Sequence, residues 1–358
     1  MRTFNKILLF VLGIIIISCK KDTTDLPAGC DVNGLWIGTW QSPGNTNGTF
    51  FAPVVQNNSA VNGNVYIRFD LPSLENIGVK FSANVHDKNV NSIIDFEEAA
   101  VKITGSVGND SLVSGNFTIS TGGGGTFNGT KIQTITPVLK EIYSSHNGLT
   151  GLICIGQRLW VWTSNGTYNG WDDYKYVVKR INYDGSFIDS LLLPCSGSIM
   201  GNRISFDGEK IWQIDVGVNR IYVFDTLGNR LDTFNSPAYY ADAIACINNQ
   251  VYITDGYNRV THILNSNAQE LSTFPNEYIS IGALCEFQQH LLMSTTFYNT
   301  LLKTDMNGKI EKAYTLPEQI VSICTNGETV WCLTQEYISS QTPGPGTSIY
   351  KIYEVQIN

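Results

Sequence analysis

Hydrophobic and polar residues alternate with a period of two along most of this chain, in short runs separated by Gly, Asn, Asp and Pro. Alternation of this kind, interrupted by turn-forming residues, predicts antiparallel β-strands. Between Cys30 and Thr136 the runs are GLWIGTW (34–40), TFFAPVVQ (49–56), NVYIRFD (64–70), VKFSANV (79–85), VKITGSV (101–107), VSGNFTI (113–119) and GTFNGTK (125–131). Seven or eight strands of this length predict a small antiparallel barrel, because a closed barrel leaves no strand edge exposed.

From Gly151 onward one pattern recurs five times: a strand of small residues, a turn, and a second strand with one large residue at its centre. The large residues, called here the anchors, are Trp160, Trp212, Tyr252, Leu292 and Trp331, spaced 52, 40, 40 and 39 residues apart. A period near 40 in a β-rich chain predicts stacked units of four strands.

The end of the chain predicts how these units close into a ring. The last repeat stops after its third strand, IYKIYEV (349–355), whereas a strand resembling a fourth one, 138–143, precedes the first repeat. Pairing the two would complete the last unit and hide its open edge. The sequence therefore predicts an all-β fold, with a small barrel at 30–136 and a five-bladed propeller at 137–358 closed by an N-terminal outer strand.

Two stretches resemble known families. GLWIGTW and GGGTFNG resemble the ends of small lipocalin-like or streptavidin-like barrels. FDGEKIWQIDVGVNRIYVFDTLGNRL (206–231) resembles the blades of NHL-type, gluconolactonase-like and glutamine-cyclotransferase-like propellers. The propeller resemblance covers a blade pattern and not an active site, and the metal ligands of gluconolactonase-like propellers are not reproduced position by position. We expect Asp215 and Asp255, which follow the second strand, to accept hydrogen bonds from turn amides.

The first residues resemble a bacterial lipoprotein signal. Arg2 and Lys6 precede an apolar run that ends at Ser18, and Ile16-Ile17-Ser18-Cys19 is similar to a lipobox. The apolar run is too short for a permanent membrane span and predicts a signal peptide at 1–18. The resemblance implies a lipid on Cys19, a tether at 19–29, and a place in the cell envelope, facing either side of the outer membrane. The alternative is an ordinary secretory peptide with a chance cysteine.

The charge of the chain argues against nucleic acid as a partner. Loss of Arg2 and Lys6 with the signal takes the net charge from −8 to about −10, whereas binding to phosphates needs a basic surface.

The cysteines follow the repeat. Seven of the eight remain after Cys19. We expect Cys154, Cys246, Cys285 and Cys324 to share one position in the first strand of their repeats, where Ser205 stands in the remaining repeat. They should then lie too far apart for disulfides and act as small apolar residues, with a metal ring as the alternative.

The stretch from Asp87 to Glu98 resembles a twelve-residue EF-hand calcium loop. Ser92 stands where that loop has Gly, and the preceding residues favour a strand instead of a helix. The resemblance implies Ca²⁺ as the one cofactor to consider, although none is required. The alternative is a polar hairpin turn followed by a strand. The implied ligands are the side chains of Asp87, Asn89, Asn91, Asp95 and Glu98 and the carbonyl of Ile93.

Ligand chemistry in the propeller is expected on the face where the inner strands begin. Two long loops there, 164–175 and 335–348, should be neighbours if the ring closes, and they carry Tyr168, Trp171, Asp172, Asp173, Glu336 and Tyr337. Aromatic rings beside carboxylates suit a glycan or a peptide. We therefore expect non-catalytic binding or scaffolding at the envelope. The alternative is a lyase, hydrolase or cyclotransferase, for which the candidate acid and base residues are Asp242, Glu318 and His146.

Overall fold

The computed structural model describes residues 33–43, 47–57, 60–70, 77–84, 90–96, 99–108, 112–119, 123–168, 174–195, 203–276, 281–295, 299–338 and 347–357. Its contacts divide the chain into two units, Met1–Thr134 and Ile135–Asn358. All elements assigned within these ranges are β-strands, which confirms the expected all-β fold. Over the same ranges no helix could cross a membrane. The expected signal, Cys19 and the tether lie outside the described residues.

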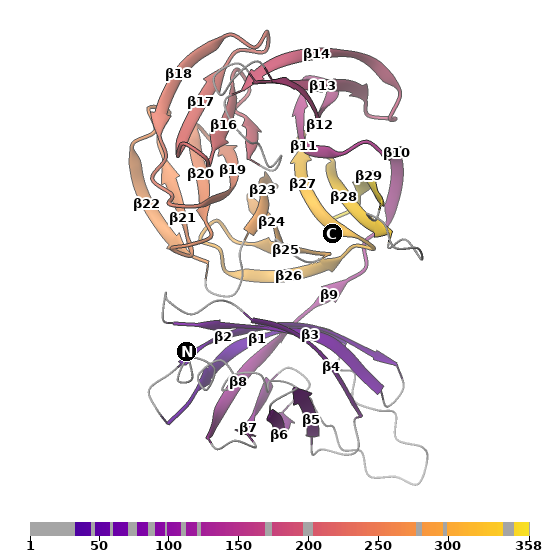
Figure 1. The fold of residues 1–358 in the computed structure, drawn as a ribbon, viewed down its shortest axis with the longest axis vertical. Helices are drawn as coiled ribbons and strands as arrows, with labels where there is room; N and C mark the ends of the chain where they lie inside the picture. The colour runs from indigo at the N-terminus through magenta and orange to yellow at the C-terminus, as the bar shows by residue number, and fades with distance from the viewer. Residues whose placement is uncertain are drawn as a thin grey trace. The chain divides into compact units, whose positions relative to one another are not determined.

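The first unit contains one antiparallel sheet of eight strands in the order β4-β3-β2-β1-β8-β7-β6-β5 (Figure 1). The described pairings leave β4 and β5 at its two ends, so they establish the sheet and not the closed barrel expected from the sequence. The strands are β1 (Gly34–Gln41), β2 (Asn47–Asn57), β3 (Ala60–Phe69), β4 (Ile77–Asn84), β5 (Val90–Phe96), β6 (Ala99–Gly108), β7 (Leu112–Ile119) and β8 (Gly124–Ile132).

The GLWIGTW run forms β1 at the middle of this sheet, and its glycine has a steric role. Trp36 and Trp40 of β1 are buried together with Phe50 and Phe127 of the neighbouring strands. A Cβ on Gly38 would lie 2.1 Å from the carbonyl oxygen of Asn128 and 2.5 Å from the Phe50 ring. The glycine therefore lets β8 and the Phe50 ring approach β1 closely.

The second unit contains five sheets of four antiparallel strands, one of which gains β9 (Thr134–Ile135) as a fifth. The first sheet contains β11 (Leu149–Ile155), β12 (Arg158–Tyr168), β13 (Tyr174–Asn182) and β14 (Phe187–Cys195). The second contains β15 (Ile204–Phe206), β16 (Ile211–Asp215), β17 (Arg220–Phe224) and β18 (Arg230–Asn235). The third contains β19 (Ala241–Ile247), β20 (Gln250–Asp255), β21 (Val260–Leu264) and β22 (Glu270–Pro275). The last two are β23 (Ile281–Phe287), β24 (His290–Thr295), β25 (Thr300–Thr304) and β26 (Ile310–Thr315) with β9; and β27 (Gln319–Thr325), β28 (Val330–Ile338), β29 (Thr347–Val355) and β10 (Leu139–Ser145).

The sheets form a propeller-like ring (Figure 1). The inner strands contact one another in the order β11, β15, β19, β23, β27 and back to β11. The closing strand is β10, which precedes the first sheet in sequence and pairs antiparallel with β29 of the last, with Leu139 opposite Val355 and Tyr143 opposite Ile352. This is the pairing that the truncated last repeat predicted.

Successive residues of the second strands pack against different neighbouring sheets. In β12, Trp160 and Trp162 contact Tyr222 and other residues of the second sheet. Leu159 and Val161, which alternate with them, pack with Trp331 of the last sheet. Because side chains on a strand point alternately to opposite faces, one strand can seal two sheet interfaces. All five anchors are buried, at 5 % exposure or less, as the repeat predicted.

The turn between the third and fourth strands repeats with the same 40-residue period. Asp225, Asn265 and Asp305 each begin such a turn, and their side-chain oxygens accept backbone hydrogen bonds within it. Gly308 adopts a positive φ of 83° in one turn, whereas Ala268 adopts 57° at the same place in another. A left-handed backbone is costly for any residue with a Cβ. Ala268 therefore marks a strained position in an otherwise regular repeat.

Candidate ligand-binding face

The face at which the inner strands begin is called here the strand-start face. Because all strands in each sheet are antiparallel, the fourth-to-first and second-to-third strand connections both end on it. The β18–β19 connection, the β20–β21 turn and the β26–β27 connection contribute described residues to this face. The side chains that follow come from these segments and from the strand ends beside them.

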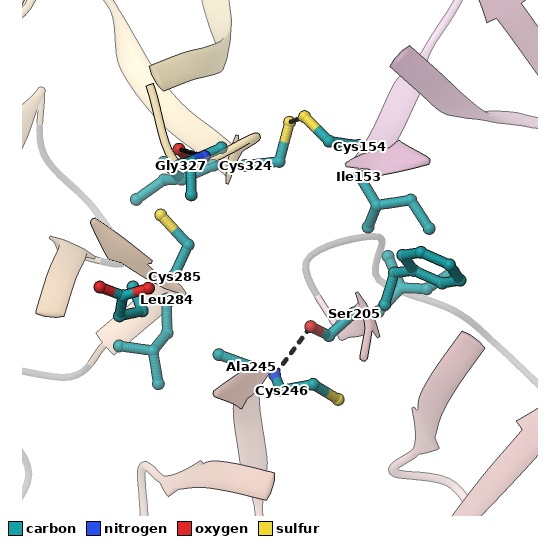
Figure 2. A pocket seen from close by; sticks show the side chains of 14 residues that line it. Ile153, Cys154, Ser205, Ala245, Cys246, Leu284, Cys285, Cys324 and Gly327 are labelled. Atoms are coloured by element: carbon teal, nitrogen blue, oxygen red, sulfur yellow. Dashed lines mark hydrogen bonds between the residues drawn. The ribbon is translucent and has the colours of Figure 1, made fainter. Parts of the chain in front are cut away.

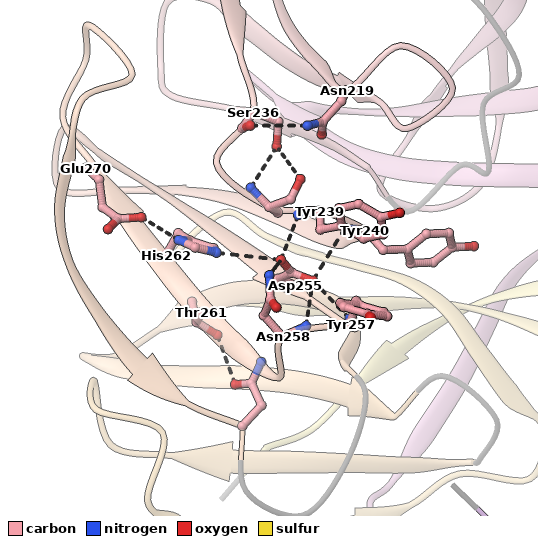
Figure 3. A network of polar contacts seen from close by, with 12 residues as sticks. Asn219, Ser236, Tyr239, Tyr240, Asp255, Tyr257, Asn258, Thr261, His262 and Glu270 are labelled. Atoms are coloured by element: carbon pink, nitrogen blue, oxygen red, sulfur yellow. Dashed lines mark hydrogen bonds and ion pairs between the residues drawn. The ribbon is translucent and has the colours of Figure 1, made fainter. Parts of the chain in front are cut away.

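Three tyrosines gather where the second and third sheets meet on the strand-start face (Figure 3). Tyr239 and Tyr240 come from the β18–β19 connection and Tyr257 from the β20–β21 turn. Their exposures are 69 %, 44 % and 57 %, and the rings of Tyr239 and Tyr257 lie 4.8 Å apart between centroids. Exposed aromatic rings in contact with one another offer an apolar surface with polar tips.

Asp255 holds the two segments that carry these tyrosines. Its side chain has no exposed surface. Oδ1 accepts hydrogen bonds from the Tyr257 and Asn258 amides at 2.9 and 3.0 Å, which confirms the turn role expected from the sequence. Oδ2 accepts from the Tyr239 amide at 2.7 Å, in the neighbouring connection. One buried carboxylate therefore fixes both sides of the tyrosine group.

A chain of acidic and basic groups extends from Asp255 toward the outer strand of the sheet (Figure 3). His262 Nε2 lies 3.8 Å from Asp255 Oδ2, and Nδ1 lies 2.5 Å from Glu270 Oε2. The Asp255 carboxylate and then Glu270 raise the pKa of His262, although burial opposes this. Burial would raise the pKa of Asp255, but the nearby His262 and the hydrogen bonds from Asn258 and Tyr239 together hold it below its usual range. Asp255 is therefore a fixed anion.

A buried arginine lies beside the tyrosine group. The Arg203 guanidinium lies 5.3 Å from the centre of the Tyr240 ring and 3.9 Å from Asp242 Oδ1. Its side chain is 6 % exposed, and within the described residues its Nε has no hydrogen-bond partner. Burial raises the pKa of Asp242 to about 6, although Arg203 acts in the opposite direction. The pair combines a donor that lacks an acceptor with a carboxyl group that titrates near neutral pH.

Glu318 directly precedes β27 and belongs to a second cluster of polar groups. Its Oε1 accepts hydrogen bonds from Lys351 Nζ at 2.9 Å and from the Tyr353 hydroxyl at 3.0 Å. Lys351 also binds Glu336 Oε2 at 3.0 Å. Burial and the nearby Glu318 raise the pKa of Tyr353 to about 12, and Glu318 followed by Glu336 raises that of Lys351. The cluster ties Glu318 into an ion pair in the last sheet.

The three candidate acid and base residues come from three separate segments of the chain. Asp242 is in β19, Glu318 directly precedes β27, and exposed His146 lies between β10 and β11. In the part of the chain that the structure describes, no hydrogen bond or ion pair joins any two of them. Asp242 contacts Arg203 and Glu318 contacts Lys351, so each carboxylate has a cationic neighbour of its own.

The expected wall between the first and last sheets is described only in part. Glu336 and Tyr337 belong to β28, and the Tyr337 side chain is 68 % exposed. Tyr168 ends β12, and Trp171, Asp172 and Asp173 lie outside the described residues. The sheets that carry the two loops are neighbours, because β11 contacts β27. The wall itself stays a prediction.

The calcium-like loop likewise falls partly outside the described residues. Asp87, Asn89 and Glu98 are not described. Asn91, Ile93 and Asp95 lie in β5, where they pair with Thr104, Lys102 and Ala100 of β6. Calcium binding stays a prediction.

The inner strands enclose a cavity of about 190 Å³ (Figure 2). Its lining includes Cys154, Cys246, Cys285 and Cys324. The expected single column of cysteines is wrong. Cys285 and Cys324 pair with the anchors Leu292 and Trp331, but Cys154 and Cys246 pair with the residue before the anchor, Leu159 and Val251.

The expected separation of these thiols is wrong as well, because the Sγ atoms of Cys154 and Cys324 lie 3.0 Å apart. Within the described residues, no group of three or more His, Cys, Asp or Glu side chains could hold a metal ion. The distance in sequence from each cysteine to its anchor already indicated that the cysteines occupy two different positions in their strands. Trp160 is six positions after Cys154, but Trp331 is seven positions after Cys324. In a strand, a difference of one residue reverses the face to which a side chain points.

Sequence reasoning also missed Tyr257 and the chain of Asp255, His262 and Glu270. Tyr239 and Tyr240 were recognisable as loop residues of the strand-start face. No local pattern shows that Tyr257, in a different connection, contacts Tyr239. Their juxtaposition comes from the Asp255 hydrogen bond to the Tyr239 amide.

Comparison with known proteins shows that the chain is similar to several solved structures. No protein-family model matches the chain, and no curated protein matches it. The structure is similar to glutaminyl cyclase of Myxococcus xanthus, with a TM-score of 0.45 and 11 % identity over 63 % of this chain and 100 % of that chain. It is also similar to a gluconolactonase-type protein, with a TM-score of 0.38 and 10 % identity over 63 % of this chain and 95 % of that one. A redesigned β-barrel is similar over 28 % of this chain and 90 % of its own, with a TM-score of 0.25 and 10 % identity.

Proposed function

We propose that this chain is a membrane-anchored lipoprotein of the cell envelope whose propeller-like unit binds a glycan or a peptide on the strand-start face. The observation that carries the proposal is the group of exposed tyrosines, Tyr239, Tyr240 and Tyr257, held in place by buried Asp255. Binding sites for sugars and peptides combine aromatic faces with a few fixed polar groups.

Rigidity distinguishes this group from a set of exposed side chains met by chance. The backbones of Tyr239 and Tyr257 are both fixed by the same carboxylate, so little conformational freedom would be lost on binding. The buried Arg203 guanidinium lies 5.3 Å from the centre of the Tyr240 ring and packs against it as a cation. A ligand with an apolar face and hydrogen-bonding groups at its edge, such as a sugar or a peptide, fits the tyrosine group.

The rest of the proposal is supported by the N-terminal sequence and by the sheet of the first unit. The lipobox-like Ile16–Cys19 supports attachment to a membrane through lipidated Cys19. The eight-stranded antiparallel sheet supports a lipocalin-like barrel as the fold of the first unit. Closure of that sheet would remove the two exposed edges that β4 and β5 otherwise present.

The test is binding of the purified chain to an oligosaccharide microarray and to a phage library of random heptapeptides. We expect retention of the wild type on one of these probes and its loss in a variant with Tyr239→Ala and Tyr257→Ala. Phe187→Ala is the matched control, because Phe187 is an exposed aromatic residue at 60 % exposure and follows a third-to-fourth strand turn, away from the strand-start face.

Two results would contradict the proposal. One is undiminished binding by the double tyrosine variant. The other is loss of binding in Trp171→Ala with Tyr337→Ala but not in the double tyrosine variant, which would move the site to the predicted wall between the first and last sheets.

One observation favours the rival function of an enzyme. Asp242 is buried, lies beside Arg203 and has a pKa raised to about 6, as an acid or base working near neutral pH requires. A lyase, hydrolase or cyclotransferase would then lose turnover in Asp242→Asn and show an apparent pKa near 6 in its pH profile. Absence of turnover on ester, lactone, uronic-acid glycan and N-terminal glutaminyl substrates would count against it.

A further inference from the structure

We propose that Cys154 and Cys324 form a disulfide that joins the first and last sheets of the propeller-like unit. Their Sγ atoms lie 3.0 Å apart although 170 residues separate them in the chain (Figure 2). Cys154 is in β11 and Cys324 is in β27, the inner strands that meet where the ring closes. A small rotation of the two side chains would bring the sulfurs to the bond length of about 2.05 Å.

The two strands are aligned so that the cysteines lie side by side. Two residues before each cysteine, Ser322 Oγ accepts a hydrogen bond from the Leu152 amide at 3.1 Å. Leu152 and Ser322 are thus level with each other, and the same spacing along both strands brings Cys154 level with Cys324. The approach of the thiols therefore follows from the backbone alignment as well as from their rotamers.

Strand register explains why this pair occurs at the closing point of the ring. At two of the contacts between inner strands, the residue that pairs with the anchor on one strand lies beside a residue of the next strand that comes one position after the anchor-paired one. Cys324 and Cys154 hold these two positions at the closing contact. Ser205 and Cys246 hold them where β15 meets β19, with the Ser205 Oγ 2.9 Å from the Cys246 amide. Within the described inner strands, two thiols meet in this way only at the closing contact.

The position also gives the disulfide a mechanical role. The last sheet is completed on its outer side by the β10–β29 ladder. Its inner side joins the first sheet through packing around Trp331 and the Ser322 hydrogen bond. A covalent bond here would close the ring a second time, at its inner edge. A crosslink over such a long loop restricts the unfolded chain strongly.

The reaction needs a disulfide oxidant, which we take to be a small molecule of the form RSSR. Cys154 is partly exposed in the cavity, whereas burial and the neighbouring Cys154 hold the pKa of Cys324 well above its usual value. The Cys154 thiolate attacks one sulfur of RSSR and releases RS⁻. The Cys324 sulfur then loses its proton, attacks the mixed disulfide and releases a second RS⁻. The two protons lost by the cysteines yield two RSH, so the oxidant is reduced as the cysteines are oxidised. Export to an oxidising compartment, as the signal-like sequence predicts, would favour the product.

The test uses the full chain equilibrated with hydroxyethyl disulfide and 2-mercaptoethanol at a series of ratios. Remaining thiols are alkylated with iodoacetamide in denaturant, and the digest is analysed by mass spectrometry. We expect a linked peptide pair containing Cys154 and Cys324 under oxidising conditions, and its replacement by two alkylated peptides on reduction. The oxidised chain should also melt at a higher temperature than the reduced chain.

The cavity supplies matched controls, since Cys285 and Cys246 line it and, among the described residues, neither has a thiol within hydrogen-bond distance (Figure 2). Cys285→Ser and Cys246→Ser should keep the linked pair and its effect on melting, whereas Cys324→Ser should lose both. Alkylation of Cys154 and Cys324 at every ratio in the wild-type chain would overturn the proposal, and so would a link from Cys154 to Cys285. These outcomes are read in the wild type and do not depend on the folding of a variant.

Discussion

Replacement of Asp255 by Asn tests how the tyrosine group is held. Asp255 Oδ1 accepts from the Tyr257 and Asn258 amides, and Oδ2 accepts from the Tyr239 amide and from Asn258 Nδ2 at 2.8 Å. An asparagine keeps one oxygen and puts an NH₂ group where the other was. The hydrogens of that NH₂ would then face two N–H donors whichever way the amide is turned.

The structure sets the size of the effect. Two buried or half-buried donors lose their acceptor, at about 1 to 3 kcal/mol each. The negative charge opposite His262 is lost as well, and breaking a buried charge pair costs about 3 to 5 kcal/mol. These contributions overlap, because the donors and the histidine share one carboxylate. We expect Asp255→Asn to lower the free energy of unfolding of the propeller-like unit by about 3 to 5 kcal/mol.

The assay is urea unfolding of the full chain followed by tryptophan fluorescence, with hydrogen exchange of the segment 236–260 to assign the change to this region. Asp225→Asn is the control, because Asp225 also caps a turn, by accepting from the Leu227 and Asn229 amides, but on an exposed surface. Its effect should be much smaller. A loss of under about 1 kcal/mol for Asp255→Asn, or one equal to that of the control, would refute the reasoning.

Four further predictions follow from other parts of the structure. The pKa of Asp242 is raised to about 6 in the folded chain, so the unfolded chain loses this proton at a lower pH. The free energy of unfolding should therefore fall by up to about 3 kcal/mol as the pH rises from 4 to 6. Urea titrations at several pH values should show this slope in the wild type and a flatter one in Asp242→Asn. Because β10 is an edge strand, only alternate residues donate a backbone N–H to β29. Proline removes that hydrogen bond at only one of two adjacent positions, so Tyr143→Pro and Ser144→Pro should melt at clearly different temperatures. Equal melting temperatures would contradict the closing ladder. Ala268→Gly should stabilise the chain by about 0.5 to 1 kcal/mol in urea unfolding, because φ at this position is 57°, and a loss of stability would show that the turn is not strained. Calcium at 1 mM should raise the melting temperature relative to EDTA in the wild type but not in Asp95→Asn, and identical melts with and without EDTA would exclude a calcium site that stabilises the fold.

Much of the fold was predictable because its signals are local. Period-two alternation and turn residues indicate strands, and the five anchors recur near every 40 residues, so both the sheet count and the Leu139–Tyr143 closing strand could be inferred. The turn role of Asp255 could also be inferred, since its partners Tyr257 and Asn258 are close in sequence. Each of these inferences depends on residues that are close together in the sequence, or on a repeat that can be recognised from the sequence.

The site depended on contacts between segments that the sequence does not relate. Tyr239 meets Tyr257 because sheet packing brings two connections together. Glu318 meets Lys351 because β27 and β29 flank β28 in one sheet. Cys154 reaches Cys324 because its spacing to the anchor differs by one residue, which turns it toward the closing contact. The sequence shows this difference in spacing but not the contact that results from it. Amino-acid order by itself determined strands, turns and repeat number, since these need only local pattern. Tertiary structure alone decided which side chains share a surface, because relative register between sheets is set by how their buried faces pack.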